Sequence, residues 1–242
     1  GGQVATPEWF AEIAHAERNF GDLEGGRDVG EQKGTGYDSR GTNLRLARKI
    51  SNDSRLTFGF QRVFMDDVPR THKTINGLSW KGLSPGSELW RRLDQLRQLS
   101  YGRLTWDESG GLADAGSVTL SLQQHEQDRN RMKTGGGDIQ SFDLDDLGIS
   151  ARFEADGPWG GRLAYGAELH RESLTSSAYK ITNTQAFDES LTQGSLAADA
   201  HYNRLAFYLS NIFDTESGLI LEPGVRYSHV NVDVDKWYKS TA

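Results

Sequence analysis

The chain has 242 residues, no cysteine and a formal net charge of −7. The absence of cysteine excludes a disulfide framework and a cysteine metal site, and the absence of a long basic run leads us to expect no nucleic-acid partner. No run of 18 apolar residues occurs, which excludes a membrane-spanning helix but not membrane-spanning strands.

Aromatic residues are frequent for so polar a chain. Hydrophobic residues make up 36% and the mean hydropathy is −0.64, yet there are six Trp, eight Tyr and ten Phe. Because disordered chains are poor in aromatic residues, we expect a folded protein that places them at particular positions. The chain begins GGQVATPEWF, without a signal peptide, so either it is not exported or it is a piece of a longer chain.

Residues 1–35 are interpreted as an entry segment that holds a strand or a short helix, followed by a loop. TPEWFAEIAHAERNF (6–20) has a helix-start signature, with Thr6 as the cap, Pro7 at the first helical position and Glu8 in the first turn. The competing interpretation is a strand over about 8–19, which would keep an up-and-down topology running. Topology favours the strand, and the helix stays open as the alternative.

From residue 36 onward, alternating runs come in pairs. In RLTFGFQRVFMDD (55–67), Leu56, Phe58 and Phe60 share one face of a strand, with polar residues and glycine on the other. Polar or glycine-rich turns such as SNDS (51–54) join the two runs of a pair, so each pair predicts a β-hairpin. The four predicted hairpins pair 36–50 with 55–67, 93–107 with 117–133, 144–156 with 162–174, and 203–214 with 219–234.

The predicted strands are long and their connections alternate in length. Eight strands of roughly 12 to 17 residues exceed the 5–6 residues typical of soluble sheets. Connections within hairpins are short, two of those between hairpins are long (about 68–92 and 175–202), and the third, 134–143, is shorter. We therefore expect an all-β fold, an antiparallel up-and-down transmembrane β-barrel section of about eight or nine long strands with short periplasmic turns and long extracellular loops.

The last predicted strand contains two residues that strands disfavour. In LILEPGVRYSHV (219–230), apolar residues alternate with polar ones, but Pro223 and Gly224 lie at the centre. Proline cannot donate to a sheet ladder, and glycine has no side chain to pack. We expect a local bulge at Pro223-Gly224, with Leu219 and Leu221 toward lipid and Tyr227 near the outer aromatic girdle.

No arrangement of residues predicts catalysis, a cofactor or a bound metal. The glycine clusters GGG (135–137) and GPWGG (157–161) are not followed by an apolar helix, so we interpret them as turns rather than phosphate-binding loops. No GxSxG nucleophile motif occurs. The histidines lack metal-ligand spacing; they are His15, His72, His125, His170, His201 and His229.

Two mixtures of acidic and basic residues, HEQDRNR (125–131) and RRLDQLR (91–97), are interpreted as barrel-wall residues that face water or one another. A ligand-guiding interior is the functional alternative.

Residues of the predicted extracellular loops are candidates for binding a ligand. They are His72, Trp80, Trp90, Tyr179 and Phe187. The aromatic side chains can stack on a ligand or pack the loops together, and the sequence favours neither. His72 lies in the longest loop, where a histidine can ligate haem iron, although a lone loop histidine usually does not.

Three segments resemble TonB-dependent outer-membrane receptors. GYDSRGTNLRLARKISNDSRLTFGFQ (36–61) resembles an early barrel hairpin of that family, and FMDDVPRTHKT (64–74) resembles the entry to the loop that follows it. LAFYLSNIFDTESGLILEPGVRYSHV (205–230) resembles a mid-barrel hairpin of the family. The resemblance covers roughly residues 30–235.

The resemblance implies a 22-stranded barrel with an N-terminal plug, located in the bacterial outer membrane. Receptors of this family take up iron–siderophore complexes, haem, cobalamin or similar scarce ligands, driven by a TonB-type energy-transducing protein of the inner membrane. This chain lacks the plug, the partner-binding box and a last strand ending in an aromatic residue. Residues 36–242 are therefore expected to be internal barrel strands, with the plug and the C-terminal strands absent from this chain. Because such a section has two open edges, we expect residues 1–242 alone not to form the native transporter.

Two other functions stay open. A soluble or surface all-β ligand-binding barrel without active transport conflicts with the strand lengths and the one-sided loops. An outer-membrane barrel enzyme lacks a catalytic constellation. The leading interpretation is non-enzymatic, with outer-membrane lipid, an energy-transducing protein and a small-molecule ligand such as a metal chelate as partners.

Overall fold

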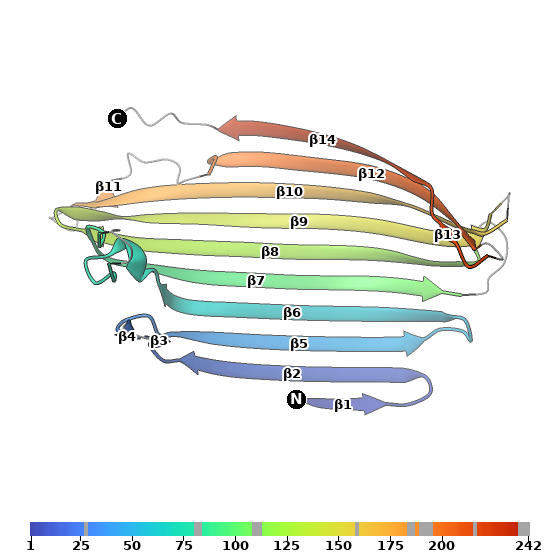
Figure 1. Ribbon diagram of the computed structural model, residues 1–242, viewed down its shortest axis with the longest axis horizontal. Coiled ribbons are helices and arrows are strands. Elements are labelled where there is room, and N and C mark those ends of the chain that lie inside the picture. Colours follow the sequence, from blue (N-terminus) through green and yellow to red (C-terminus); the bar gives the residue numbers. More distant parts are fainter. Residues whose placement is uncertain are drawn as a thin grey trace.

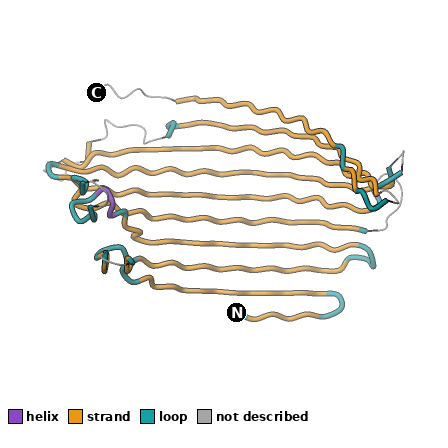
Figure 2. The backbone as a smooth tube through the Cα atoms, viewed as in Figure 1, coloured by secondary structure: helices purple, strands orange, loops and turns teal. Residues whose placement is uncertain are grey.

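One antiparallel sheet accounts for most of the protein in the computed structural model, which describes residues 1–26, 29–79, 84–107, 113–157, 160–182, 187–188, 196–214 and 217–236. The sheet follows chain order (Figure 1), and its strands are β1 (Gly2–Ala5), β2 (Trp9–Phe20), β5 (Tyr37–Lys49), β6 (Ser54–Pro69), β7 (Glu88–Trp106), β8 (Ala115–Lys133), β9 (Gly136–Asp156), β10 (Arg162–Thr182), β11 (Phe187–Asp188), β12 (Asp199–Asp214), β13 (Ile220–Leu221) and β14 (Gly224–Lys236). β3 (Leu23–Gly25) and β4 (Gly30–Gln32) form a separate hairpin. The one helical turn among the described residues is the 3-10 turn η1 (Thr71–Lys73), drawn in purple in Figure 2.

The four predicted hairpins are confirmed, and so is the predicted fold class. β5 pairs with β6, β7 with β8, β9 with β10, and β12 with β13 and β14. Short turns gather at one end of the sheet, on the right in Figure 1, and most long connections lie at the opposite end. We call these the turn end and the loop end.

Residues 9–20 form strand β2 rather than a helix. The residues with a helix-start signature make the turn between β1 and β2 instead. The N–H of Trp9 donates to Oγ1 of Thr6 at 2.9 Å, and the N–H of Thr6 donates to the carbonyl of Trp9 at 2.8 Å. Pairing of β2 with all of Tyr37–Arg48 outweighs the local capping preference.

The strands are longer than predicted, because they continue into the expected connections. β9 and β10 have 21 residues each. The predicted connection 134–143 is wrong: Lys133 already pairs with Gly136, which leaves Thr134 and Gly135 as the turn. The remaining residues are polar but keep the alternation of a strand, and backbone hydrogen bonds to β8 and β10 do not require apolar side chains.

The sheet has two chemically distinct faces, which we call the apolar face and the polar face. On the apolar face, register places Leu120 opposite Gly102 and Ile149, and Ile149 opposite Leu169. Large apolar side chains of this face are exposed toward the turn end: Val4, Trp9, Ile13, Leu46, Leu56, Phe58, Leu104, Leu120, Leu122, Leu147, Ile149, Leu169, Phe207, Leu209, Val225 and Tyr227.

The polar face carries the alternate residues of the same strands. Thr119 lies there between Arg103 and Ser150, and Nε of Arg103 donates to Oγ1 of Thr119 at 2.9 Å. The face to which each strand residue points is therefore set by the alternation of a single ladder.

The described residues form no conventional hydrophobic core. In the described ranges, the buried apolar residues are five alanines and Leu93, and no large side chain is fully buried. No described segment forms a second layer over either face of the sheet (Figure 1). Among the described residues, no helix has the length and hydropathy needed to cross a membrane.

The predicted bulge at Pro223-Gly224 is wrong, although the strand is interrupted there. Ser210 pairs with Gly224 and Phe213 pairs with Leu221, three residues further along both strands. No residue is therefore inserted, as a bulge would require. The N–H of Asn211 donates to the carbonyl of Pro223 at 3.1 Å, but Pro223 has no N–H to return, so the ladder is broken without a change of register.

We expect two strand glycines to differ in their tolerance of a side chain. A Cβ on Gly166 would overlap the carbonyl oxygen of Ala151 and the hydroxyl of Tyr208, whereas a Cβ on Gly41 would meet open space. Gly166→Ala should lower the free energy of unfolding by about 1–3 kcal/mol. Gly41→Ala should leave it unchanged or raise it by about 0.5–1 kcal/mol. Guanidinium unfolding followed by tryptophan fluorescence measures both, and equal effects would contradict the close approach at Gly166.

Candidate functional site

The two faces differ in charge. Strand alternation places these basic residues on the polar face: Arg18, Arg45, Lys49, Arg55, Arg91, Arg97, Arg103, Arg129, Arg131, Lys133, Arg152, Arg162, Lys180, Arg204 and Arg226. The carboxylates of that face are fewer: Glu12, Glu88, Asp138, Asp146, Glu154, Asp156, Glu168, Glu172 and Asp214. The polar face is thus basic although the whole chain has a net charge of −7.

Beyond its apolar belt, the apolar face is acidic. Three pairs of carboxylates lie directly opposite each other on neighbouring strands: Asp38 with Asp66, Asp94 with Asp128, and Glu126 with Asp143. Like charges in this arrangement repel each other. The sheet therefore has an excess of cations on one face and an excess of carboxylates on the loop half of the other.

A buried ion-pair network crosses three strands at the loop end of the polar face. The side chain of Glu88, in β7, is 6% exposed. Arg91 donates from Nε to Oε2 of Glu88 at 2.8 Å and from Nη2 to Oε1 at 2.5 Å. In β8, Arg131 reaches Oε1 of Glu88 at 3.5 Å and donates from Nε to Oδ2 of Asp138, in β9, at 2.7 Å. Arg129 completes the network with a 2.7 Å bond from Nη2 to Oδ1 of Asp138.

Backbone carbonyls of two network residues anchor the loop that contains η1. The N–H of Ile75 donates to the carbonyl of Glu88 at 2.8 Å, and the N–H of Arg70 donates to the carbonyl of Arg91 at 2.9 Å. Gly86 closes the far side of the loop through its N–H, which donates to the carbonyl of Thr74 at 3.1 Å. The first residues of β7 therefore hold both the charged wall and the connection beside it.

His72 lies on η1, exposed at the loop end. Partial burial and the neighbouring cations Arg70 and Lys73 lower the pKa of His72 below its ordinary value of 6.5. Its imidazole is therefore neutral at pH 7, the form that accepts a hydrogen bond or ligates a metal.

The other predicted ligand residues do not gather around His72. Trp90 and Tyr179 are both partly exposed on the side of the apolar face, on strands β7 and β10. β8 and β9 lie between those strands. Phe187 is in β11 opposite Ile181, and Trp80 lies outside the described residues. Whether any of them contacts a ligand stays a prediction.

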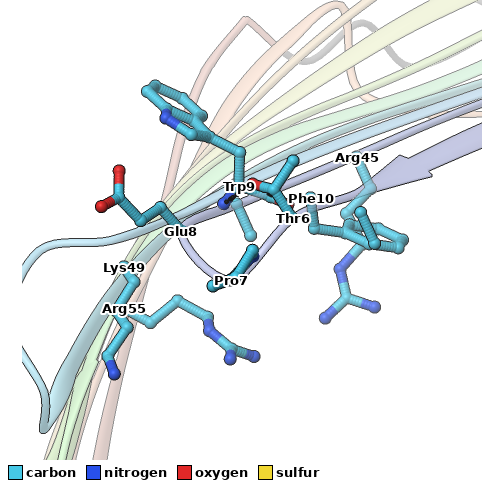
Figure 3. A pocket seen from close by; sticks show the side chains of 10 residues that line it. Thr6, Pro7, Glu8, Trp9, Phe10, Arg45, Lys49 and Arg55 are labelled. Atoms are coloured by element: carbon cyan, nitrogen blue, oxygen red, sulfur yellow. Dashed lines mark hydrogen bonds between the residues drawn. The ribbon is translucent and has the colours of Figure 1, made fainter.

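A depression of about 340 Å³ lies at the turn end of the polar face, beside the turn between β1 and β2. Figure 3 shows Arg45, Lys49 and Arg55 pointing to one side of the sheet, and Glu8 and Trp9 pointing to the other. The guanidinium carbon of Arg45 lies 5.6 Å from the centre of the Phe10 ring. A cationic surface therefore occurs at the turn end of the polar face as well as at the loop end.

The network of Glu88, Arg91, Arg131 and Asp138 was not predicted as a unit. Its members belong to the two mixed-charge segments, or next to them, and lie far apart in the chain. Hairpin pairing of β7 with β8 places Arg91 opposite Arg131, and pairing of β8 with β9 places Arg131 opposite Asp138. The charged residues can be read from the sequence. The strand register that brings them together was not predicted. In the described part of the chain, no group of histidine, aspartate and glutamate is placed to hold a metal ion.

No protein-family model matches the chain, and no curated protein matches it. Solved structures that are similar in fold include two receptors. The ferric preacinetobactin receptor BauA from Acinetobacter baumannii superposes with a TM-score of 0.63 at 15% sequence identity, covering 93% of this chain and 37% of that one. The ferric yersiniabactin uptake receptor FyuA from Yersinia pestis gives a TM-score of 0.57 at 12% identity, covering 93% of this chain and 35% of that one.

At these identities the likeness shows the fold alone. The chain has the fold of a section of the β-barrel of such receptors, as the resemblance to TonB-dependent receptors implied. It spans little more than a third of the length of either structure.

We expect Glu88→Gln to loosen the loop that contains η1. Removing a charged partner from buried arginines costs about 1–3 kcal/mol, so the amides of Arg70, Ile75 and Gly86 should exchange with solvent about tenfold faster or more. Hydrogen exchange measured by mass spectrometry tests this. Glu126→Gln, on the other face and without an ion pair among the described residues, is the control; equal exchange in the two variants would contradict the anchoring role of Glu88.

Acid should loosen the same loop in the unmodified protein. Burial favours the neutral form of Glu88, but hydrogen bonds and charges from Arg91 and Arg131 outweigh it and hold its pKa below the ordinary value of 4.5. The stability that this carboxylate contributes is complete above pH 4.5 and is lost as the pH falls through the lower folded pKa. After correction for intrinsic rates, protection of Ile75 should therefore fall in acid, and the fall should be absent from Glu88→Gln.

Proposed function

We propose that this chain is part of the barrel wall of a TonB-dependent receptor in the bacterial outer membrane, which takes up a scarce ligand such as an iron–siderophore complex, haem or cobalamin. The observation that carries the proposal is a single-layer sheet with an exposed apolar belt on one face and a basic polar wall on the other. The receptor-barrel fold supports it.

The apolar face needs a partner that is itself apolar. In water, each of its exposed leucines and phenylalanines would leave apolar area unburied, at a cost of about 25 cal/mol per Å². Lipid removes this cost. Lipid offers no hydrogen-bond partners to backbone N–H and C=O groups, but the strand ladder does. The apolar belt occupies the turn half of the strands, so the turns face the periplasm and the long connections face the outside.

The polar face then lines the interior through which the ligand passes. The two similar structures described above are a ferric preacinetobactin receptor and a ferric yersiniabactin uptake receptor, which favours a metal chelate as the ligand among the three classes. Energy would come from a TonB-type protein that acts through a plug outside this chain. The role is transport rather than catalysis.

Uptake assays test the proposed function directly. Cells that produce the full receptor should accumulate a ⁵⁵Fe-labelled chelate, haem or cobalamin from a panel that includes hydroxamate, catecholate and carboxylate siderophores. Collapse of the proton-motive force should abolish accumulation but leave surface binding intact. A receptor that binds no member of the panel, or whose uptake is independent of the proton-motive force, would contradict the proposal.

A pair of adjacent residues tests the membrane orientation of the sheet. Leu120→Arg should lower the free energy of unfolding by about 2–4 kcal/mol in lipid vesicles, because Leu120 lies within the apolar belt. Thr119→Arg, on the polar face, should be far milder. Denaturant titration in vesicles measures both, and equal costs would mean that the apolar face is not the lipid face.

A further inference from the structure

A second depression, which we call the β8–β9 pocket, lies at the loop end of the polar face. It has a volume of about 440 Å³ and is lined by Arg131, Lys133, the glycines 135–137, Asp138 and Lys180. This volume is within the range of small-molecule sites, about 300–1,000 Å³. Unlike the depression beside the edge strand β1, it lies between strands that are paired on both sides.

The glycines of the turn are required by its geometry. Gly135 and Gly136 have φ values of 97° and 142°, a region that other residues rarely adopt, and a Cβ on Gly137 would overlap the carbonyl oxygen of Arg131. On the polar face of β9, Gly136 presents bare backbone directly opposite Lys133. The next residue of β9 on that face is Asp138, directly opposite Lys180.

The charges around the pocket are unbalanced. Arg131, Lys133 and Lys180 contribute three positive charges and Asp138 contributes one negative charge, so the lining has a net charge of +2. Asp138 is already engaged by Arg129 and Arg131. Among the described residues, neither lysine has a carboxylate partner.

Arg129, beside the pocket lining, has one side-chain nitrogen without a hydrogen-bond partner among the described residues. Arg129 lies opposite Gln140, which lines the pocket. Its Nε is buried and has no hydrogen-bond partner among the described residues. A buried donor without a partner costs free energy, and an acceptor that enters the pocket from solvent would complement the positive charge of this group.

We propose that the β8–β9 pocket binds the anionic group of the ligand, a carboxylate or a phosphate. Guanidinium and ammonium groups both form charge-assisted hydrogen bonds to these anions. Lys133 and Lys180 are separated by strand β9 and are offset by two residues along it, which places their backbones roughly 12 Å apart. The two lysines can therefore contact different ends of one polyanion. Lipid phosphate is not the source, because the pocket opens on the face opposite the apolar belt.

The inference deepens the proposed function and rests on it for the ligand that carries the anionic group. It predicts an anionic ligand and assigns the pocket to the outer side of the barrel, where the ligand first arrives. The basic residues along the rest of the polar face would then attract the same ligand toward the turn end.

Citrate and inorganic phosphate are suitable probes of the pocket. By isothermal titration calorimetry on the detergent-solubilised full receptor, citrate should bind saturably and trimethyl citrate, its neutral ester, should not. Lys133→Gln combined with Lys180→Gln should weaken citrate binding on the order of tenfold or more. Lys33→Gln combined with Arg62→Gln removes the same charge elsewhere and should leave binding unchanged.

Three results would contradict anion binding at this pocket: no saturable binding of citrate or phosphate, equal binding of the neutral ester, or an equal loss of citrate affinity in the two double variants. Because the substituted lysines are exposed, the variants should fold, and an unchanged circular dichroism spectrum checks this.

The panel of labelled chelates distinguishes the pocket proposal from the proposed function. If the receptor imports a chelate but the double lysine variant binds citrate as the unmodified protein does, only anion binding at the pocket is refuted. Citrate binding that the lysine variant abolishes, in a receptor that imports no member of the panel, refutes the proposed function alone.

Discussion

The backbone hydrogen-bond ladder is the interaction on which the rest of this structure depends. The described residues bury no large side chain completely, so packing cannot hold the strands together as it does in a two-layer domain. The strands are joined by continuous antiparallel pairing instead, over 21 residue pairs between β9 and β10. Where one donor is missing, at Pro223, the strand assignment stops and resumes in the same register. A ladder of this kind tolerates a local break because the pairs on either side still fix the alignment.

The ladder also explains why the two faces can be so different. Successive side chains of a strand point to opposite faces, so one register decides the environment of every residue in a strand at once. The apolar belt, the acidic band beyond it and the basic polar face all follow from that alternation. The directly opposed carboxylates, such as Glu126 and Asp143, show that register is not chosen to optimise each neighbouring pair. The apolar belt and the long ladder outweigh their repulsion.

The two faces of the sheet differ in charge. A chain with a net charge of −7 presents cations on its polar face and at both ends of it. Three arginines of the loop end form ion pairs with Glu88 and Asp138, and backbone carbonyls of Glu88 and Arg91 hold the loop with η1. The lysines beside this network, Lys133 and Lys180, have no ion pair among the described residues.

Much of the site was beyond the reach of sequence patterns because it is built from pairs distant in the chain. Arg91 and Arg131 are neighbours only through the register of β7 and β8, including the irregularity near Glu88. Trp90 and Tyr179 were predicted as loop residues, and long-range pairing makes them strand residues on the side of the apolar face. Similarly, the turn at Thr134 and Gly135 was hidden within a polar stretch, since polarity alone does not distinguish a loop from a strand with polar side chains on both faces.

The sequence by itself determined the period-two alternation, the hairpin partners, the absence of disulfides and the chemical character of each face, because these depend on residues close together in the chain. Local capping at Thr6 and Pro7 was overridden, and topology alone favoured the strand that formed. Only the tertiary structure decided the strand ends, the unshifted register across Pro223, the buried network around Glu88 and the basic pocket beside the β8–β9 turn. Each of these depends on which residues lie opposite each other on separate strands, and that alignment is set by the sum of many backbone hydrogen bonds rather than by any local segment.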